Sequence, residues 1–457
     1  MTFAPRRLSA AAAAILIWPV AARAETFTLA EALTLTYQYN PDLDAQRAAL
    51  RATDEGVAEA NGAWRPQIGV TGSYGYSELT LPAQLFSAGG TFAYHPTIAD
   101  ASITEPLFRG GRTYAEVKKA KAQVKAGVYQ LAAVEESVLL AGVTAYMDVV
   151  RNEATLDLKR NNVAVLQTEL KGVEEAKRVG ELTKTDVAQS HARLAGAQAD
   201  LVTAETQLAV SRSNFEHVIG RAAETLDSGP ALPKLPDSEN AAVTVALRDN
   251  PQVQAAQENA HAADYAVDDA LGALLPQLSV TGQYTYTHGS PNSFSLGTVR
   301  EAAVIGQVTV PIYQGGSEEA AVRQAKQQRS QAELLIAGTE RQVVDAAHTA
   351  WQAYVAATAT IRSIEEQVEA DKTAFDGARQ EQQYGTRTVL DVLNAEQELL
   401  SSEVSEVQAK HDAVVAAYQV LSVMGQLTAQ GLHLNVKIYD PKAYYNENES
   451  RWFGLGD

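Results

Sequence analysis

The side chains that most often carry chemistry are sparse in this sequence, and their spacing forms no catalytic or metal-binding motif. The chain has no cysteine, which excludes disulfide frameworks, thiolate metal sites, thiol nucleophiles and a lipidated N-terminal cysteine. Its eight histidines show neither the HExxH pattern nor a paired metal-ligand spacing, and the sequence has no phosphate-binding loop. We therefore expect no enzyme activity, no metal site and no cofactor.

Charge gives the next indication of function. The chain carries 55 acidic and 37 basic side chains, a formal net charge of -18, so it lacks the basic face that binding to nucleic acid requires. Arg387 and Asp391 stand four residues apart in a segment with helical period. On a solvated helix such a pair contributes only about a few tenths of a kcal/mol. From spacing alone, an exposed helix pair is the simplest interpretation of these two residues.

The first 24 residues have the three-part pattern of a secretory signal peptide. Arg6 and Arg7 precede a mostly apolar run from Leu8 to Val20, and Ala22-Arg23-Ala24 follows as a cleavage site. A membrane anchor is the alternative, but the apolar run is shorter than the about 20 residues that span a bilayer as a helix. We expect residues 1–24 to be a signal peptide and the mature chain to be exported.

The remaining sequence contains an internal duplication. Asn40-Pro41 recurs as Asn250-Pro251 with an offset of 210 residues, and Gly180 recurs as Gly385 with an offset of 205 residues. One five-residue deletion in a surface loop accounts for the change of offset. The sequence therefore predicts a first structural repeat over residues 25–225, a Pro-rich linker over 226–240, a second repeat over 241–430 and a C-terminal tail over 431–457.

Proline and glycine spacing predicts a long helical hairpin in each repeat. The proline-free stretches 107–229 and 312–440 are each divided by a repeated glycine, Gly180 or Gly385. The long arms, 112–179 and 317–384, would be roughly 100 Å long as helices, and the returning arms, 186–220 and 391–425, roughly 50 Å.

Shorter helices over 41–65 and 251–275 follow the Asn-Pro pairs. Stacked end to end on the returning arms, they would complete the partner of each long arm and leave the linker at mid-height on the rod. In the first long arm, an apolar seam from Val117 to Val173 has the 3.5-residue period of a coiled coil, interrupted at Lys121, Glu135 and Asn152.

Four segments alternate apolar and polar residues with a period of two: 67–77, 99–107, 277–287 and 304–312. The 99–107 copy is degraded, with Glu105 on its apolar face. An ordinary sheet with one wet face fits this alternation. Membrane strands fit it as well, and an aromatic girdle on the apolar face favours them: Tyr74, Tyr76, Tyr284 and Tyr286. Four strands cannot close a barrel, so membrane strands require several chains to share one.

The doubled Asn-Pro helix, the Pro-Gln strand and the hairpin tips VGELTKTDV (179–187) and YGTRTVLDV (384–392) resemble the TolC-like outer-membrane efflux and type I secretion channels. The resemblance covers nearly all of residues 25–430. It implies a mainly α fold with a β-barrel part: long α-helical coiled-coil hairpins form a periplasmic tunnel, and four transmembrane strands per chain close a shared twelve-stranded barrel in a homotrimer.

The resemblance also implies an exit duct in the outer membrane of a Gram-negative bacterium, surrounded by outer-membrane lipid. Such a duct works with a periplasmic adaptor protein and an inner-membrane pump or ABC transporter. The sequence does not separate efflux of small molecules from secretion of proteins. A periplasmic coiled-coil adaptor or scaffold protein of an envelope complex is the alternative, although adaptors carry one hairpin between lipoyl-like and barrel domains.

The resemblance assigns roles to residues at the hairpin tips. It implies that the tunnel closes there, with Arg387 bonding near Thr185, Asp186 anchoring the neighbouring hairpin and Asp391 forming a threefold acidic ring. Lumen charges select ions by sign, so an acidic tunnel is expected to prefer cations.

Two tip positions depart from the family pattern. Gln382 stands where a tyrosine that bonds to the Asp186 equivalent is expected, and Asn394 stands where a second acidic ring is usual. We therefore expect the closed state to be held in a different way.

Gly180 and Gly385 have a local reason to be glycine, because a helical hairpin needs a residue that tolerates positive φ. The resemblance adds that these tips receive the adaptor, with Leu182, Thr183 and Lys184 along the contact. We further expect part of the C-terminal tail to pack near the linker and its last residues to be mobile.

Overall fold

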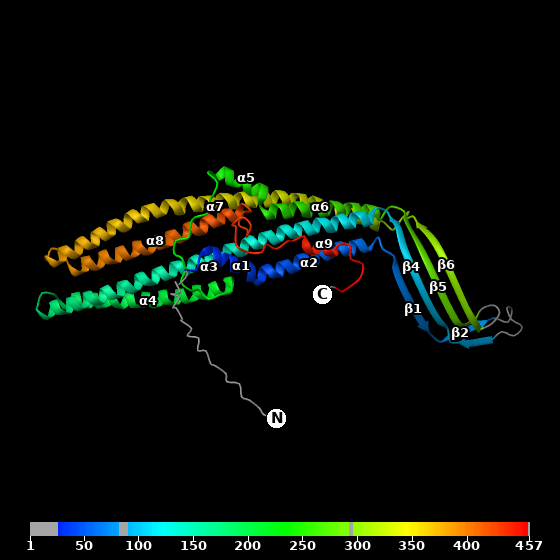
Figure 1. Cartoon of the computed structure of the whole chain (residues 1–457), viewed down its shortest axis with the longest axis horizontal. Helices are drawn as coiled ribbons and strands as arrows, with labels where there is room; N and C mark the ends of the chain where they lie inside the picture. Colours follow the sequence, from blue (N-terminus) through cyan, green and yellow to red (C-terminus); the bar gives the residue numbers. More distant parts are fainter. Residues whose placement is uncertain (1–25, 82–89, 292–295, 456–457) are drawn as a thin grey trace, which may run out of the picture.

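The computed structural model describes residues 26–81, 90–291 and 296–455, so the expected signal peptide lies outside the described residues. The chain is an elongated rod of helices that ends in a sheet (Figure 1). Two helical hairpins extend to the end of the rod opposite the sheet, and several short helices and loops gather at mid-height. Among the described residues, none of the helices is both long and apolar enough to span a membrane.

The two long helices are α3 (Arg112–Arg178) and α7 (Ser317–Gln383), within one residue of the predicted arms. Each turns back into a shorter helix, α4 (Lys184–Ile219) or α8 (Val389–Val423). These returning helices begin two residues earlier than predicted, because Thr183 and Thr388 cap their first turns. The predicted hairpins are confirmed.

The Asn-Pro pairs join the short helices to the returning helices. In α2 (Pro41–Gly62) and α6 (Pro251–Gly272), proline occupies the first turn and the preceding asparagine is the N-cap. The amide of Asn40 donates to the Val218 carbonyl at 3.3 Å, near the end of α4. The amide of Asn250 donates to the Val423 carbonyl at 2.9 Å, at the end of α8. Each asparagine thus links the two stacked helices that together line one long arm, as predicted.

The apolar seam of α3 is packed along most of its length. Within the predicted seam, Val117 and Val128 are half-buried, and the remaining residues are buried: Val124, Leu131, Val138, Ala145, Val149, Leu156, Val163, Leu166, Leu170 and Val173. The polar interruptions have partners, because Asn152 donates to the Gln207 carbonyl at 3.3 Å and Glu135 accepts from the Ala429 amide at 2.7 Å.

Three short helices were not predicted: α1 (Leu29–Tyr39), α5 (Glu239–Asp249) and α9 (Ala443–Asn448). The bounds of α1 and α5 differ by 210 residues, so they belong to the same duplication. Thr28 and Ser238 cap them at matching positions, a signal that the sequence carries. As a result, the segment expected as linker enters a helix at Glu239.

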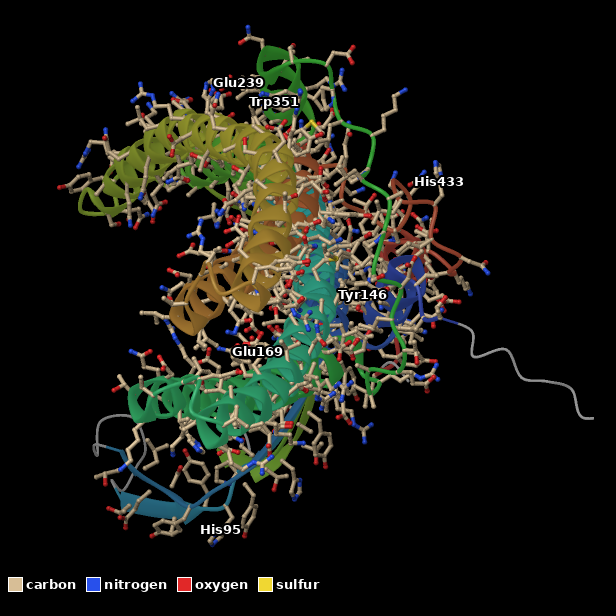
Figure 2. All side chains as sticks on the ribbon, turned by 90° about the vertical axis from the view of Figure 1, so that its left-hand side faces the viewer. His95, Tyr146, Glu169, Glu239, Trp351 and His433 are labelled. Atoms are coloured by element: carbon tan, nitrogen blue, oxygen red, sulfur yellow. The ribbon has the colours of Figure 1, made fainter. Side chains whose placement is uncertain are left out.

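The core at mid-height fixes the start of the linker. The hydroxyl of the fully buried Tyr146 lies 2.8 Å from the Phe27 carbonyl and 2.9 Å from the Asp227 carbonyl (Figure 2). The beginning of the C-terminal tail packs against the same core through the half-buried Leu432, Leu434 and Val436. The rest of the tail runs along α2 and includes α9, well beyond the expected mid-height position (Figure 1).

The sheet contains the four predicted strands, β1 (Gln67–Tyr74), β4 (Thr97–Arg109), β5 (Gln277–Pro291) and β6 (Leu296–Thr309), in the order β1-β4-β5-β6. All neighbours are antiparallel. A separate hairpin, β2 (Ser77–Leu81) and β3 (Gly90–Tyr94), was not predicted and extends the first repeat beyond the main sheet.

Two details of the predicted strands are wrong. A register shift between Pro106 and Phe108 takes Leu107 out of the ladder, so Phe108 pairs with Leu278 in its place. Strand β6 ends at Thr309, so Val310 and Ile312, expected on its apolar face, follow the strand.

Candidate functional site

The two hairpin tips have the same local construction. Gly180 and Gly385 adopt positive φ of 88° and 76°, which confirms the reason given for glycine at both turns. After each turn, a threonine and an aspartate form a capping box, Thr183 with Asp186 and Thr388 with Asp391.

The capping boxes keep both aspartates charged. Asp186 Oδ2 accepts from Thr183 N and Oγ1, both at 2.8 Å, and Asp391 Oδ2 accepts from Thr388 N at 2.9 Å and Oγ1 at 2.7 Å. These bonds lower the pKa of both carboxyls below the usual value for aspartate. Each repeat therefore places a carboxylate at the first turn of its returning helix.

Arg387 is held within its own hairpin. Its Nε donates to Glu381 Oε2 at 2.9 Å, across the turn between α7 and α8, and this bond raises the pKa of Arg387. Thr185 is exposed and Gln382 is half-buried. The contact expected between Arg387 and Thr185 stays a prediction.

Asn394 joins the two hairpins of the chain. Its Oδ1 accepts from Arg193 Nη2 at 2.8 Å, so α8 of the second hairpin is bonded to α4 of the first. Sequence reasoning missed Arg193, because the two residues are 201 positions apart and no local pattern relates them. Position 394, where the family pattern has a second acidic ring, therefore carries an interhelical hydrogen bond in this chain.

An apolar cluster packs beside this bond. It combines residues from three helices: Val163, Leu166 and Val173 of α3, Ala197 of α4, and Val389 and Leu393 of α8. Leu182, expected to face an adaptor, is half-buried against this cluster, whereas Thr183 and Lys184 are exposed. Leu182 thus contributes to packing between the hairpins.

Two carboxyl groups lie within the same contact. Glu396 of α8 is 7% exposed and faces the half-buried Glu169 of α3. Burial, followed by the proximity of Glu169, raises the pKa of Glu396 to about 8, while Arg379 opposes the shift. Burial also raises the pKa of Glu169. At neutral pH the pair therefore retains a proton, and sequence reasoning gave no sign of it.

A second polar contact joins the hairpins farther from the tips. His411 of α8 is buried, with Nε2 3.0 Å from Asp148 Oδ1 of α3 and Nδ1 2.9 Å from Asp412 Oδ1. Asp148 also pairs with Arg151 at 3.0 Å. His411 is therefore an interface residue between the two hairpins.

The two faces of the sheet differ in polarity. On one face, Asp100 Oδ2 accepts from Gln283 Nε2 and Thr285 Oγ1, both at 2.7 Å, and the Thr104 and Thr281 hydroxyls lie 3.1 Å apart. The opposite face presents exposed apolar side chains: Ile68, Val70, Ile103, Val304 and Val308.

The four tyrosines lie toward the end of the sheet away from the helices. Tyr74 stacks on His95 with ring centroids 5.9 Å apart, and Tyr76 lies 5.5 Å from the same ring. In the ladder, Tyr284 pairs with Ala101 and Tyr286 with Ala99. Gly72 also pairs with Ala99, so Gly72 and Tyr286 lie at the same level of the sheet. Tyr74, two residues farther along β1, therefore lies one same-face position beyond Tyr286 on the apolar face. The arrangement suits an aromatic girdle, and this role stays a prediction.

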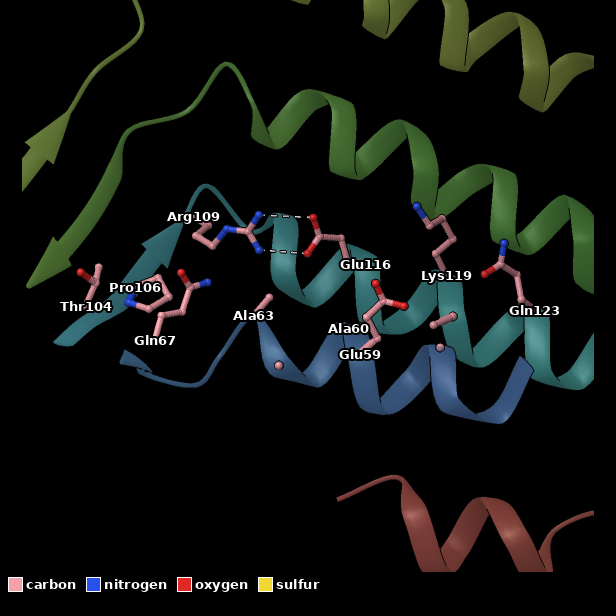
Figure 3. Close-up of a pocket in the computed structure, with 13 residues that line it drawn as sticks. Glu59, Ala60, Ala63, Gln67, Thr104, Pro106, Arg109, Glu116, Lys119 and Gln123 are labelled. Atoms are coloured by element: carbon pink, nitrogen blue, oxygen red, sulfur yellow. Dashed lines mark hydrogen bonds and ion pairs between the residues drawn. The ribbon is translucent and has the colours of Figure 1, made fainter. Parts of the chain in front are cut away.

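A polar cavity lies where the helices meet the sheet. It has a volume of about 720 Å³ and lies between α2, α3 and the ends of β1 and β4 (Figure 3). Two of the charged side chains that line it pair with one another, because Arg109 Nη1 donates to Glu116 Oε2 at 3.0 Å; it also donates to Thr113 Oγ1 at 3.1 Å. Within the described residues, no group of three histidine or carboxylate side chains is placed to hold a metal ion.

Strands β1 and β6 are the two edges of the main sheet, and in the described part of the chain neither is paired along its outer side. An open edge is not stable in lipid, where each backbone polar group needs a partner. A sheet with one apolar face and two open edges therefore fits a segment of a barrel built from several chains.

Comparison with known proteins relates this geometry to a family. Residues 32–221 and 242–426 match the family described as "Outer membrane efflux protein". The chain is 34% identical over 428 residues to outer membrane efflux protein BepC of Brucella suis biovar 1, covering 94% of this chain and 92% of BepC. It is 24% identical over 351 residues to alkaline protease secretion protein AprF of Pseudomonas aeruginosa, covering 75% of this chain and 72% of AprF.

The fold is also similar to that of a solved structure. The outer membrane protein VceC of Vibrio cholerae superposes with a TM-score of 0.74 at 18% identity, covering 87% of this chain and 96% of VceC. The two matched ranges lie within residues 25–225 and 241–430, one in each half of the duplication. The chain therefore belongs to the outer membrane efflux protein family and is located in the outer membrane of a Gram-negative bacterium.

Proposed function

We propose that three copies of this chain form a continuous duct, with a shared twelve-stranded barrel in the outer membrane and a helical tunnel in the periplasm. The observation that carries the proposal is the four-stranded sheet, which has one apolar face and two open edges. Three such sheets joined edge to edge give a barrel within the size range of closed membrane barrels. Family membership over both repeats argues against the adaptor alternative.

The lengths of three of the four strands support this placement, whereas β1 has 8 residues in the ladder. Strands β4, β5 and β6 have 13, 15 and 14 residues, more than the about 9–11 residues that a tilted strand needs to cross a bilayer. Apolar and polar residues alternate between the two faces, as required for lipid outside and water inside. The polar face with Asp100, Gln283 and Thr285 then faces the lumen.

The duct is gated at the hairpin tips in this proposal. The Asp391 carboxylates of three chains form an acidic ring, and Asp186 lies on the neighbouring hairpin tip. The packed state of the hairpins is held by the Arg193–Asn394 bond, the apolar cluster and the protonated Glu169–Glu396 pair. This accounts for how the tips close although Gln382 and Asn394 depart from the family pattern.

A periplasmic adaptor docks at the tips and couples the duct to an inner-membrane pump or ABC transporter. Gly180, Gly385, Thr183 and Lys184 are exposed at the turns and can receive it. The likeness to BepC favours a role in efflux. Protein secretion is the second candidate, which the likeness to AprF favours.

Two measurements test the proposal. The native mass of the detergent-purified protein should correspond to three chains of the processed polypeptide, and a single-chain mass would contradict a shared barrel. In a strain that lacks the gene, growth inhibition by toxic small molecules and the amount of secreted protein separate the two transport roles. We expect increased sensitivity to small molecules and unchanged protein secretion.

A further inference from the structure

The C-terminal segment is fixed along α2 and runs toward the sheet. Tyr444 donates to Glu55 Oε1 at 2.7 Å, Asn61 Nδ2 donates to the Glu449 carbonyl at 2.9 Å, and Arg65 Nη1 donates to the Arg451 carbonyl at 2.6 Å. These contacts advance together along both segments, so the tail reaches Arg65, just before β1, and the described end of the tail then bends back beside α2 (Figure 1).

The last described residues direct apolar side chains into solvent. Trp452 is 58% exposed, Phe453 87% and Leu455 107%. The Arg65 guanidinium lies 4.8 Å from the centre of the Trp452 ring and holds the indole in place. Three large apolar side chains among four residues are thus held at a defined place on the chain without being buried by it.

That place is level with the edge of the proposed membrane segment. Arg65 precedes Gln67, the first residue of β1, by two residues, or about 7 Å of extended chain at most. The polar layer between hydrocarbon and water is about 5–7 Å deep on each side of a bilayer. Trp452 contacts the Arg65 guanidinium and therefore lies beside the start of β1, at the periplasmic end of the proposed membrane segment.

Other aromatic residues occur at the same end of the sheet. Trp64 is exposed just before β1, and Tyr313 is exposed just after β6. Tryptophan and tyrosine are enriched at the membrane–water boundary because one part of each ring system is apolar and another part is polar. Trp64, Tyr313 and Trp452 are therefore placed for a second aromatic belt, at the opposite end of the strands from Tyr74.

The surrounding charge suits phospholipid. The exposed Arg451 and the half-buried Arg65 adjoin Trp452 in a chain whose net charge is -18. Guanidinium groups bind phosphate oxygens, so these two arginines match the headgroups of the periplasmic leaflet.

We propose that residues 452–455 form an interfacial anchor, which inserts Trp452, Phe453 and Leu455 at the boundary of headgroups and acyl chains in the periplasmic leaflet. The inference rests on the proposed function, which places the sheet in the membrane and the rod in the periplasm. The anchor secures each chain to the bilayer outside the barrel wall, in a protein with no cysteine that could carry a lipid.

Quenching of tryptophan fluorescence by brominated phospholipids tests the anchor. The sequence has tryptophan at positions 18, 64, 351 and 452, and Trp18 lies in the expected signal peptide. The double variant Trp64→Phe/Trp351→Phe of the processed chain leaves Trp452 alone. In liposomes of phosphatidylethanolamine and phosphatidylglycerol brominated near the headgroup end of the acyl chains, its emission should be strongly quenched. Adding Phe453→Asp should reduce the quenching.

Two matched variants serve as controls. Trp64→Phe/Trp452→Phe leaves Trp351, which lies on α7 beside α5 and far from the sheet, so its emission should not change (Figures 1 and 2). Trp351→Phe/Trp452→Phe leaves Trp64, which lies just before β1. Quenching of Trp64 reports whether this end of the sheet is at the membrane, as the proposed orientation requires.

Quenching of Trp64 without quenching of Trp452 would overturn the anchor and leave the proposed orientation intact. If neither residue is quenched, the orientation fails as well. A blue-shifted, unquenched Trp452 would overturn the anchor by showing that the segment packs on a neighbouring chain.

Discussion

Replacing Glu396 with glutamine should remove a pH-dependent weakening of the contact between the two hairpins. In the packed state the pKa of Glu396 is raised from the reference value of 4.5 to about 8 by burial and by Glu169. In a separated state the carboxyl is solvated and returns toward 4.5. The packed state therefore binds more protons, so its stability contribution is fully present below pH 4.5 and is lost as pH rises through about 8.

The size of the effect follows from the shift. Each pKa unit corresponds to about 1.4 kcal/mol, so retaining the proton at pH 7 costs at most about 3 kcal/mol. Glutamine has nearly the same shape and is neutral at every pH. Glu396→Gln should therefore keep the hairpins packed at pH values at which the wild type begins to separate.

Single-channel conductance measured across this pH range provides the assay. Wild-type conductance should rise as pH increases toward and beyond about 8, and Glu396→Gln should show a flat profile. Glu398→Gln is the matched control, because Glu398 is exposed on the same helix and its replacement should preserve the wild-type profile. Equal pH dependence in wild type and Glu396→Gln would refute the role assigned to the buried pair.

Three further predictions concern the tips and the helix joints. Arg193→Ala should raise conductance at neutral pH by removing the bond to Asn394. Asn394→Asp should keep conductance low, because a carboxylate also accepts from arginine. Equal conductance in wild type and Arg193→Ala would exclude the bond as part of the closure. Asp391→Asn should weaken cation preference, measured as the reversal potential in a salt gradient, and an unchanged potential would place the selective charges elsewhere. Asn250→Ala should lower the free energy of unfolding by about 2 kcal/mol, through loss of an N-cap and of the bond to the Val423 carbonyl. Asn250→Asp keeps the cap and should lose about half as much. Thermal unfolding in detergent measures both losses, and equal losses would argue against a stabilising bond between Asn250 and the end of α8.

Much of the fold could be predicted from the sequence because it depends on signals that act locally. Proline and glycine fix where the long helices begin and turn, and alternation of apolar residues marks the strands. The same logic could have found α1 and α5, whose caps at Thr28 and Ser238 repeat with the 210-residue offset. The register shift near Leu107 could not be predicted, because it depends on how β4 meets β5 in space.

The candidate site was only partly predictable for the same reason. The capping aspartates and the turn glycines follow from residues within one turn of helix. The contact between the hairpins does not, because its partners come from different repeats: Arg193 meets Asn394 across 201 positions, and Glu169 also meets a residue of the other hairpin, Glu396. Glu396 has no local feature that distinguishes it from the solvated glutamates of the same helix.

The measurement that tests the central claim most directly is single-channel conductance of the purified protein in planar bilayers, with the wild type beside Arg387→Ala and Asp391→Ala. We predict a small wild-type conductance, a larger one in Arg387→Ala because the Glu381 bond at the turn is lost, and weaker cation preference in Asp391→Ala. Absence of channels from a folded sample, or conductance that neither tip variant changes, would contradict a duct gated at the hairpin tips.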